Sequence, residues 1–395
     1  MRCDIRVSIV GGAGRVGLPL ALVLAKNGFN VQIIDLDYKK IELINKSKMP
    51  FSETGAQEIL KNLPVGCLNA SSTLKHIEGT DYCVLVVGTP VSTDGKPSSG
   101  SLLHLIGDML PYLSSTKILI LRSTVYPGIT QEIKEFLAKN DCNIEVAFCP
   151  ERLVEGDAIR EIKTLPQIIG VETDIAFKYA STLFNSISPE IIRTNFREAE
   201  IMKLFANSFR YLQFAIANEF FQICVKNNIN WENVWGALKQ NYPRMASLPK
   251  PGFAAGPCLV KDTQQLDYYA SGSFRLGKVA LDVNEKLPDF IFEFLREKTE
   301  INNKVIGILG MTFKGNIDDF RDSLSFRLKK MFESNSRMVY CSDAVLQKSY
   351  FVTTAELIEK SDIVIIAAPH DEYKNLIIDK PLIDIWRISN NESLI

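Results

Sequence analysis

The sequence lacks the features that would place it in several specialised classes of protein. No apolar run is long enough to span a bilayer, and the N-terminus shows no cleavable signal, so neither kind of segment is expected. The net charge is −1, which leaves no overall field to attract nucleic acid or an anionic membrane. No short repeat or low-complexity segment is present. The 395 residues exceed what one core holds, so two or three globular domains are expected.

Closely spaced cysteine pairs are absent as well. The eight cysteines stand at irregular intervals without a CxxC pair, so no metal site is expected. Cys83, Cys142 and Cys149 lie in or beside apolar runs that are typical of buried strands. Reduced thiols of this kind predict a cytoplasmic protein.

A glycine-rich segment near the N-terminus stands in a strand–helix–strand context. A β-rich run at 5–10 is followed by GGAGRVG at 11–17, by an apolar helical pattern at 18–25, and by a second strand at 31–35 that ends in an acid. In this context the fingerprint GxGxxG binds a dinucleotide. A purely structural turn is the alternative.

The fingerprint predicts a role for each of its glycines. Gly12 permits the tight turn, Gly14 lets the backbone approach the pyrophosphate, and Gly17 allows close packing of helix on strand. Asp35 is placed to accept hydrogen bonds from the adenosine ribose, which favours NAD over NADP. The predicted cofactor site also includes two residues of the same turn, Arg15 and Val16.

Three further β-rich runs each end in a polar or Gly/Pro-rich segment, and they cover residues 82–87, 117–121 and 144–148. Parallel strands place such ends along a ligand crevice, so Thr89, Thr124 and Glu151 are predicted to face the cofactor or the substrate. The alternative is that these side chains only cap the helices that follow.

One long helical pattern runs from about residue 196 to 228. It is mostly apolar, yet Lys203 and Asn207 stand four residues apart and share a face. A solvated lysine is the ordinary interpretation, but the apolar surroundings favour a buried and functional one. A helix of this length often packs against a second copy, which predicts a homodimer.

A cysteine stands in the Gly/Pro-rich segment at 251–262. Such a backbone can approach a ligand closely, and the charged pair Lys261 and Asp262 can influence the thiol of Cys258. A dinucleotide that accepts hydride and a nucleophilic thiol together predict oxidation of an alcohol or aldehyde through a covalent thioester.

The C-terminal part begins a new β-rich run at 303–310, with further runs at 337–341 and 362–367. Its glycines do not complete a second GxGxxG, so no second dinucleotide is expected. Lys314 and Arg321 follow the first run and are predicted to hold a phosphate or nucleotide, the alternative being ordinary surface charges.

These patterns predict an α/β chain with two Rossmann-like doubly wound domains joined by a long central helix and a helical middle domain. The expected boundaries are 1–195 for the NAD-binding domain, 196–300 for the helical domain with the dimer interface and the Cys258 loop, and 301–395 for a C-terminal Rossmann-like domain that holds a phosphate or nucleotide.

The assembled segments resemble one family over nearly the whole chain, the nucleotide-sugar 6-dehydrogenases. This group contains UDP-glucose, GDP-mannose and UDP-N-acetylhexosamine dehydrogenases. The matching segments, in the family's order, are GGAGRVGLPLA, GTPVSTDGKPS, RSTVYPG, CPERLVEGDA, EAEIMKLFANSFR, GFAAGPCLVKD and FKGNIDDFRDS. The CPERLVEG block and the run 242–244 most resemble the N-acetylhexosamine branch.

The resemblance implies two successive oxidations of the sugar C6 alcohol, with two NAD per sugar and a thiohemiacetal and thioester on Cys258. It implies that Lys203 and Asn207 stabilise developing oxyanions. It also implies that Asp262 helps a bound water act as base. The uronates of this family commonly enter surface polysaccharides.

The remaining site residues follow from the same resemblance. It implies that Glu151 activates the hydrolytic water and that Thr124 helps to position it. Arg244 would reach into the partner subunit's site. The predicted substrate contacts are Glu155, Lys203, Asn207, Arg244, Phe253, Phe313, Lys314 and Arg321.

The sequence departs from the family pattern at several positions. Ala254 and Ala255 stand where glycines are usual, which leaves the Cys258 loop less free around the sugar. Val260 replaces a common proline, and Arg122 stands where acidic or neutral residues are commoner, without an assigned role. The C-terminal domain is also short for the family.

Two rival functions stay open. One is a two-electron 3-hydroxy acid or alcohol dehydrogenase, which would lack the thiol and the third domain. The other is a catalytically silent homologue that keeps the NAD and nucleotide-sugar sites. Cys258 and the segment 314–321 argue against the first, and the intact set of reactive residues argues against the second.

Overall fold

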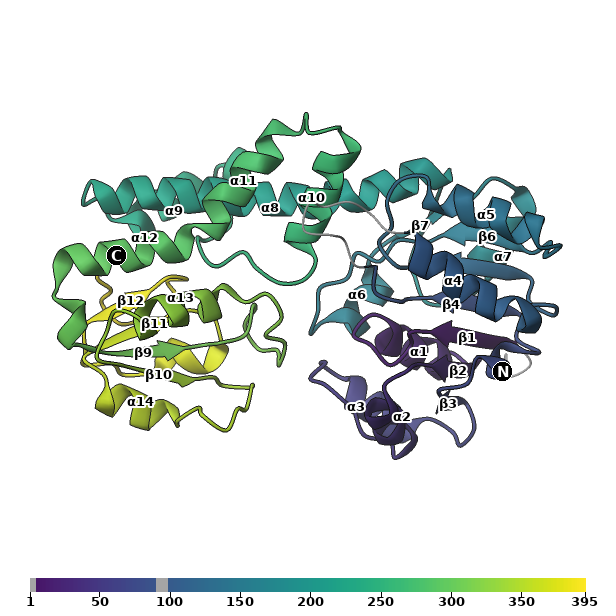
Figure 1. Ribbon diagram of the computed structural model, residues 1–395, viewed down its shortest axis with the longest axis horizontal. Helices are drawn as coiled ribbons and strands as arrows, with labels where there is room; N and C mark the ends of the chain where they lie inside the picture. The colour runs from purple at the N-terminus through teal and green to yellow at the C-terminus, as the bar shows by residue number, and fades with distance from the viewer. Residues whose placement is uncertain (1–4, 90–98) are drawn as a thin grey trace. The chain divides into compact units, whose positions relative to one another are not determined.

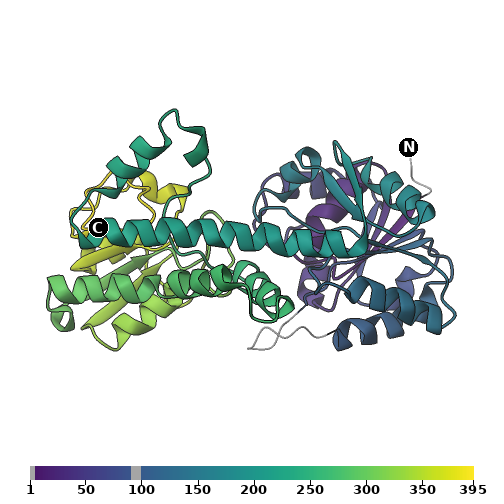
Figure 2. The ribbon, with the colours of Figure 1, turned by 90° about the horizontal axis from the view of Figure 1, so that it is seen from above.

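The computed structural model describes residues 5–89 and 99–395. Residues 90–98 of the GTPVSTDGKPS segment therefore lie outside the described residues. The chain divides into two compact units, Met1–Ala206 and Asn207–Ile395, with the division inside one helix, α8. Figure 2 shows α8 (Phe196–Lys226) as one uninterrupted helix, which confirms the long helix expected from the sequence.

The first unit is built on an eight-stranded sheet with the order β3-β2-β1-β4-β5-β6-β7-β8. All neighbours pair in parallel except β6 and β7. The order 3-2-1-4-5-6 is that of a dinucleotide-binding doubly wound sheet. The strands are β1 (Arg6–Val10), β2 (Asn30–Ile34), β3 (Leu68–Ser71), β4 (Tyr82–Leu85), β5 (Ile118–Leu121), β6 (Glu145–Phe148), β7 (Gln167–Gly170) and β8 (Ile191–Thr194).

Helices cover both faces of this sheet (Figure 1). Along β1, Val7 and Ile9 enter one core and Val10 enters the other, because successive side chains of a strand point to opposite faces. The first core receives α1, α2, α3, α6 and α7, and the second receives α4, α5 and the start of α8. The helices before α8 are α1 (Gly17–Lys26), α2 (Tyr38–Asn45), α3 (Ala56–Asn62), α4 (Gly100–Met109), α5 (Ile129–Lys139), α6 (Ala158–Thr164) and α7 (Asp174–Phe184).

The second unit combines helices with a four-stranded parallel sheet of order β10-β9-β11-β12. Side chains of α8, α12 and α13 pack on one face of the sheet, and α14 packs on the other (Figure 1). The elements are α9 (Trp231–Lys239), α10 (Leu259–Tyr269), α11 (Arg275–Glu285), α12 (Leu287–Lys298), β9 (Val305–Leu309), α13 (Leu324–Glu333), β10 (Met338–Ser342), α14 (Thr354–Lys360), β11 (Ile363–Ile366) and β12 (Leu382–Asp384).

The predicted α/β class with two Rossmann-like sheets and a helical middle is confirmed. Each predicted strand forms within two residues of its expected bounds. Sequence reasoning missed β3, β7, β8 and β12, which are three or four residues long. None of the helices among residues 5–89 and 99–395 is long and apolar enough to cross a membrane.

Candidate active site

The glycine-rich turn joins the end of β1 to the start of α1. Gly11 is the residue of this turn with a left-handed backbone, at φ 78°. At position 12 a glycine is required because a Cβ there would lie 2.6 Å from the Ile9 carbonyl oxygen. A Cβ on Gly17 would lie 2.6 Å from the Gly12 Cα, so helix and turn pack as expected. The surroundings of Gly14 are open, with Gly11 O at 3.6 Å from a built Cβ. The turn therefore leaves room for a pyrophosphate beside the N-terminus of α1.

Asp35 follows β2 and braces this turn. One carboxylate oxygen accepts the Ala13 N–H at 2.9 Å, and the other accepts the Asp37 N–H at 3.1 Å. A carboxylate oxygen accepts two hydrogen bonds, so each keeps capacity for a ribose hydroxyl. The residues present thus fit the adenosine part of NAD.

Arg15 and Glu155, predicted for the cofactor and the substrate respectively, contact each other in the first unit. Arg15 Nη1 lies 2.9 Å from Glu155 Oε1, and the guanidinium stacks over the Phe51 ring at 4.9 Å. The ion pair ties the loop after β6 to the glycine-rich turn. Val16 is half exposed at the N-cap of α1.

The ends of β4 and β5 also meet as predicted. Thr89 Oγ1 donates a hydrogen bond to the Thr124 carbonyl oxygen at 2.5 Å, and Ser123 Oγ donates to Val87 O at 2.7 Å. Thr89 and Thr124 therefore lie together at the carboxyl edge of the parallel sheet, where doubly wound folds bind their ligands.

Arg122 has a partner that the sequence did not reveal. At the ends of β5 and β6, Arg122 Nη2 forms an ion pair with Glu151, and the two side chains are only 3% and 9% exposed. Arg122 Nη1 also donates to Gln167 Oε1 at 2.8 Å. Glu151 Oε1 accepts the Leu153 N–H at 2.7 Å. Arg122 therefore compensates the buried charge of Glu151 and fixes its orientation.

Two buried carboxylates that sequence reasoning missed hold the loops of the first unit. Glu53 accepts the N–H groups of Gly156 and Ala158, and Glu200 of α8 accepts those of Gly128 and Thr130. Burial raises the pKa of both carboxyls, although these N–H groups oppose the rise. The two side chains cap α6 and α5, and they hold the loops that carry Glu155 and Thr124.

The thiol segment occupies the second unit. Cys258 is exposed and forms the N-cap of α10, and its carbonyl oxygen accepts the Asp262 N–H at 2.9 Å. Asn207 of α8 donates from Nδ2 to Asp262 Oδ2 at 2.5 Å. Asp262 is fully buried, and Oδ1 accepts no hydrogen bond from the residues described, although Lys261 Nζ lies 3.7 Å away. One turn before Asn207 in α8, Lys203 is 9% exposed, as a buried lysine was predicted to be.

The backbone before Cys258 packs tightly on aromatic rings. A Cβ on Gly252 would lie 2.5 Å from the Trp386 ring, and a Cβ on Gly256 would lie 2.6 Å from the Phe313 ring. Gly256 also has φ 96°, which a residue with a side chain rarely adopts. The structure therefore brings the Cys258 loop against the predicted nucleotide segment through Phe313.

The remaining residues of this loop are packed rather than presented to solvent. Ala254 and Ala255 are buried, and each enters an apolar cluster of the second unit. Phe253 is 2% exposed and lies in the core with Leu248. Its placement favours an anchoring role for a side chain that was predicted to contact substrate.

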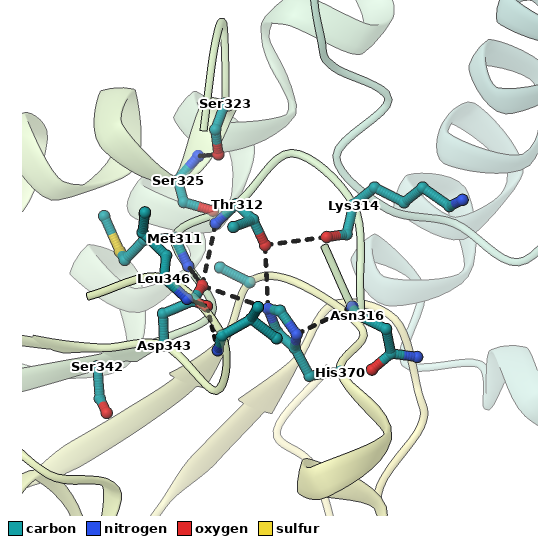
Figure 3. A network of polar contacts seen from close by, with 12 residues as sticks. Met311, Thr312, Lys314, Asn316, Ser323, Ser325, Ser342, Asp343, Leu346 and His370 are labelled. Atoms are coloured by element: carbon teal, nitrogen blue, oxygen red, sulfur yellow. Dashed lines mark hydrogen bonds and ion pairs between the residues drawn. The ribbon is translucent and has the colours of Figure 1, made fainter. Parts of the chain in front are cut away.

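The predicted nucleotide segment follows β9. The Lys314 carbonyl oxygen accepts a hydrogen bond from Thr312 Oγ1 at 2.9 Å, whereas its side chain extends away from this network (Figure 3). Arg321 is exposed, and its guanidinium pairs with Asp319 through Nε and Nη2. The backbone of Lys314 is thus fixed, and a phosphate at Arg321 would share the guanidinium with Asp319.

Arg244 lies in the second unit, in a short turn after α9. It is exposed, and its Nη1 lies 3.3 Å from Tyr242 Oη, with the guanidinium over the Tyr242 ring at 5.6 Å. Stacking on a neighbouring ring leaves further donor N–H groups of this guanidinium directed to the surface.

The fold and the first unit's site define a dinucleotide-binding protein that carries a second parallel-sheet domain. Three family models match in order: the NAD binding domain of the UDP-glucose/GDP-mannose dehydrogenase family at residues 5–188, its central domain at 197–286, and its UDP binding domain at 307–391. The chain belongs to this family, and it is an NAD-dependent oxidoreductase.

Relatives are similar over most of their length. A UDP-N-acetyl-D-mannosamine dehydrogenase of Methanocaldococcus jannaschii is 30% identical over 94% of this chain and 87% of its own. One of Campylobacter jejuni is 30% identical over 93% and 96%. The solved structure of a UDP-D-ManNAc dehydrogenase from Pyrococcus horikoshii has a TM-score of 0.90 at 26% identity, covering 98% of this chain and 97% of that one.

Proposed function

We propose that this chain oxidises the C6 hydroxyl of a UDP-N-acetylhexosamine to the uronic acid, with UDP-N-acetyl-D-mannosamine as the first candidate, through a thioester on Cys258. The names of the relatives support the sugar, as does the likeness of CPERLVEG to the N-acetylhexosamine branch. The observation that carries the chemistry is the exposed Cys258 at the N-cap of α10, one turn before a buried Asp262 that Asn207 holds. A two-electron dehydrogenase has no use for that arrangement.

Each oxidation would use one NAD at the glycine-rich turn as hydride acceptor, so two NAD are consumed per sugar. In the first, the C6 alcohol loses a hydride and a proton to become an aldehyde. The buried Lys203 and the amide of Asn207 supply donors for the alkoxide that develops at the sugar oxygen. Asp262, with one carboxylate oxygen that accepts no hydrogen bond from the residues described, can hold the water that takes the proton.

The second oxidation passes through the thiol. The Cys258 sulfur adds to the aldehyde carbon, its proton leaves to solvent, and the new oxyanion is protonated to give a thiohemiacetal. Loss of a second hydride and a proton from this adduct gives the thioester. The N-terminus of α10 favours the thiolate and the oxyanion, because helix N–H groups stabilise negative charge.

Hydrolysis releases the product. Water attacks the thioester carbon, the carbon–sulfur bond breaks, and the thiol leaves as the carboxylate forms. Glu151 is proposed to accept the proton of this water, and Thr124 to orient it. The buried ion pair with Arg122 fixes the position of the Glu151 carboxylate at the end of β6.

We further propose that the protein acts as a homodimer formed along α8. Five apolar side chains of α8 are exposed by 41–61% and recur at spacings of four, seven, four and three residues: Phe205, Phe209, Ile216, Phe220 and Ile223. This heptad spacing forms one stripe, which fits a second copy of the helix. The exposed Arg244 would then complete the partner's site. We propose the same three domains as before, at 1–195, 196–300 and 301–395. We also propose a cytoplasmic location, because a thiol nucleophile requires a reducing compartment.

A trapping experiment tests the thioester. Glu151→Gln enzyme mixed with UDP-N-acetyl-D-mannosamine and NAD is expected to accumulate a sugar adduct on the Cys258 peptide, measured by mass spectrometry after an acid quench. The double variant with Cys258→Ser gives no adduct. Turnover at the normal rate by Glu151→Gln, without an adduct, would exclude the proposed hydrolysis step, and an adduct on another residue would exclude Cys258.

Co-expression tests the shared site. An Arg244→Ala subunit lacks the arginine that it would contribute to its partner's site, and a Cys258→Ser subunit lacks the nucleophile of its own site. A dimer of one such subunit with the other holds one complete site. We expect about a quarter of wild-type activity from random assembly of two inactive variants. No recovery despite mixed dimers would contradict the role of Arg244 across the interface.

A further inference from the structure

Three loops meet at the carboxyl edge of the second sheet. They follow β9, β10 and β11, and His370, in the third, is fully buried between the other two (Figure 3). A buried histidine in this position has no role in the chemistry proposed above. Its hydrogen bonds, however, end on the segment that carries Phe313 and Lys314.

The pattern of donors fixes the state of the imidazole ring. The Asn316 N–H donates to His370 Nδ1 at 3.0 Å, so Nδ1 carries no proton. Thr312 Oγ1 donates its hydrogen to the Lys314 carbonyl oxygen, so it can only accept at the other ring nitrogen. The proton therefore lies on Nε2, directed between Thr312 Oγ1 at 3.0 Å and Asp343 Oδ2 at 3.2 Å.

The Asp343 carboxylate lies beside Nε2 of the His370 ring. Its Oδ2 accepts the N–H groups of Met311 and Thr312, and its Oδ1 accepts those of Val345 and Leu346. The Asp343 carboxylate stands after β10 as Asp35 stands after β2, but each Asp343 oxygen accepts two protein N–H groups where each Asp35 oxygen accepts one. The Asp343 oxygens therefore keep no capacity for a ribose hydroxyl of the kind that Asp35 could accept.

The loop after β9 is held in an unusual conformation. Asn316 has φ 61°, a left-handed value that a non-glycine residue rarely adopts. Besides the bond to His370, its side chain exchanges two hydrogen bonds with Asp371, at 2.7 and 2.9 Å. A side chain on Gly315 would collide with the Pro369 carbonyl oxygen. The loop after β11 therefore imposes the shape of residues 312–316.

We propose that His370, as the neutral Nε2–H tautomer, is the positioning residue that holds the loop of residues 312–316 in the conformation that binds the uridine diphosphate part of the substrate. The Lys314 carbonyl oxygen is held through Thr312, and the Lys314 side chain extends away from this polar network (Figure 3). Phe313 is held on Gly256 of the Cys258 loop, as described above. This inference rests on the proposed nucleotide-binding role of the segment 313–321.

Three substitutions of His370 distinguish the role of Nδ1 from that of Nε2. His370→Asn keeps an acceptor near Nδ1, His370→Gln keeps a polar group near Nε2, and His370→Leu keeps neither. Exposed His104 offers a matched control as His104→Asn. The dissociation constants of UDP and of NAD are measured by calorimetry on each full-length variant.

We expect His370→Leu and His370→Gln to weaken UDP binding about tenfold, the scale of a lost buried hydrogen bond, with NAD affinity unchanged. His370→Asn should stay close to wild type. In turnover, the weakened variants should show a raised KM for the nucleotide sugar with kcat nearly unchanged, because only binding is affected.

Each other outcome has a defined meaning. Equal UDP affinity in all variants overturns the positioning role, as does an equal loss of UDP and NAD binding, which marks a general loss of fold. Rescue by Gln instead of Asn overturns the assignment of Nδ1 as the essential acceptor. If wild-type protein binds no UDP, the proposed function fails instead, and this outcome is separate from the others.

Discussion

Arg122 and Glu151 form an ion pair that is almost fully buried, although the two residues belong to different strand ends and lie 29 positions apart in the sequence. Removing one partner leaves the other charge uncompensated in a buried site. We expect Arg122→Met to lower the free energy of unfolding by about 3 kcal/mol, measured by urea denaturation.

The control for this prediction is Lys134→Met. Lys134 pairs with Glu172, but the two side chains are 36% and 41% exposed, so a change of less than about 1 kcal/mol is expected. Equal effects of the two substitutions would show that the buried pair contributes no more than a surface pair.

The cysteines should differ sharply in reactivity. Burial raises the pKa of Cys83, Cys149 and Cys341 to about 12, so their thiolate forms are scarce at neutral pH. Cys258 is exposed at a helix N-terminus. We expect iodoacetamide to label Cys258 first, with loss of activity in step, as followed by peptide mass spectrometry. Inactivation that tracks another cysteine would contradict the assignment.

Replacing the proposed nucleophile should separate binding from chemistry. Cys258→Ser is expected to abolish uronate formation and to leave NAD affinity unchanged, because no residue of the glycine-rich turn is altered. Cys142→Ser, a change at a half-buried cysteine, is the matched control and should retain activity. Full turnover by Cys258→Ser would rule out the thioester mechanism.

Asp35 should contribute directly to cofactor affinity. Asp35→Ala is expected to weaken NAD binding by about 1–2 kcal/mol, the scale of lost hydrogen bonds to a ribose. Asp35→Asn keeps one acceptor and should lose less. Fluorescence titration of both variants checks this, and an unchanged affinity in Asp35→Ala would remove the ribose role.

The second unit should show an acid-sensitive component that depends on Asp343. Burial raises the pKa of this carboxyl, but His370 and the N–H groups of Leu346 and Val345 outweigh burial, so the net pKa lies below the ordinary value of 3.8. A lowered pKa in the folded state stabilises the fold above pH 3.8, and this stabilisation is lost as the pH falls through the folded value.

The difference in Tm between wild type and Asp343→Asn should therefore be largest above about pH 4 and shrink below it. Asp108→Asn, at an exposed carboxyl, should leave the Tm nearly unchanged at every pH. A difference between wild type and Asp343→Asn that stays constant from pH 3 to pH 6 would contradict the lowered pKa.

The central strands of both sheets could be predicted because each is encoded by a few consecutive residues. The fingerprint and the β-rich runs each lie within a few consecutive residues, and so do Cys258 and Asp262, which share one helical turn. The missed strands are short, and three of them, β3, β8 and β12, lie at the edges of their sheets. In β3 and β8 most residues are only partly buried or exposed, which gives little pattern.

The supporting residues could not be found in the same way. Glu53 binds Ala158 across 105 positions, Glu200 binds Thr130 across 70, and His370 binds Asn316 across 54. A single acidic residue or histidine in a sequence is ordinarily a surface charge, and only the fold reveals that these are buried. The role of Arg122 became visible for the same reason.

The stoichiometry of NADH tests the central claim most directly. NADH formed per sugar consumed is measured with UDP-N-acetyl-D-mannosamine, beside UDP- and GDP-linked glucose and mannose and the other N-acetylhexosamines. The account predicts two NADH per molecule of a UDP-N-acetylhexosamine, with the uronate as product. One NADH per sugar, with an aldehyde or ketone as product, would contradict the four-electron reaction and leave Cys258 without its proposed role.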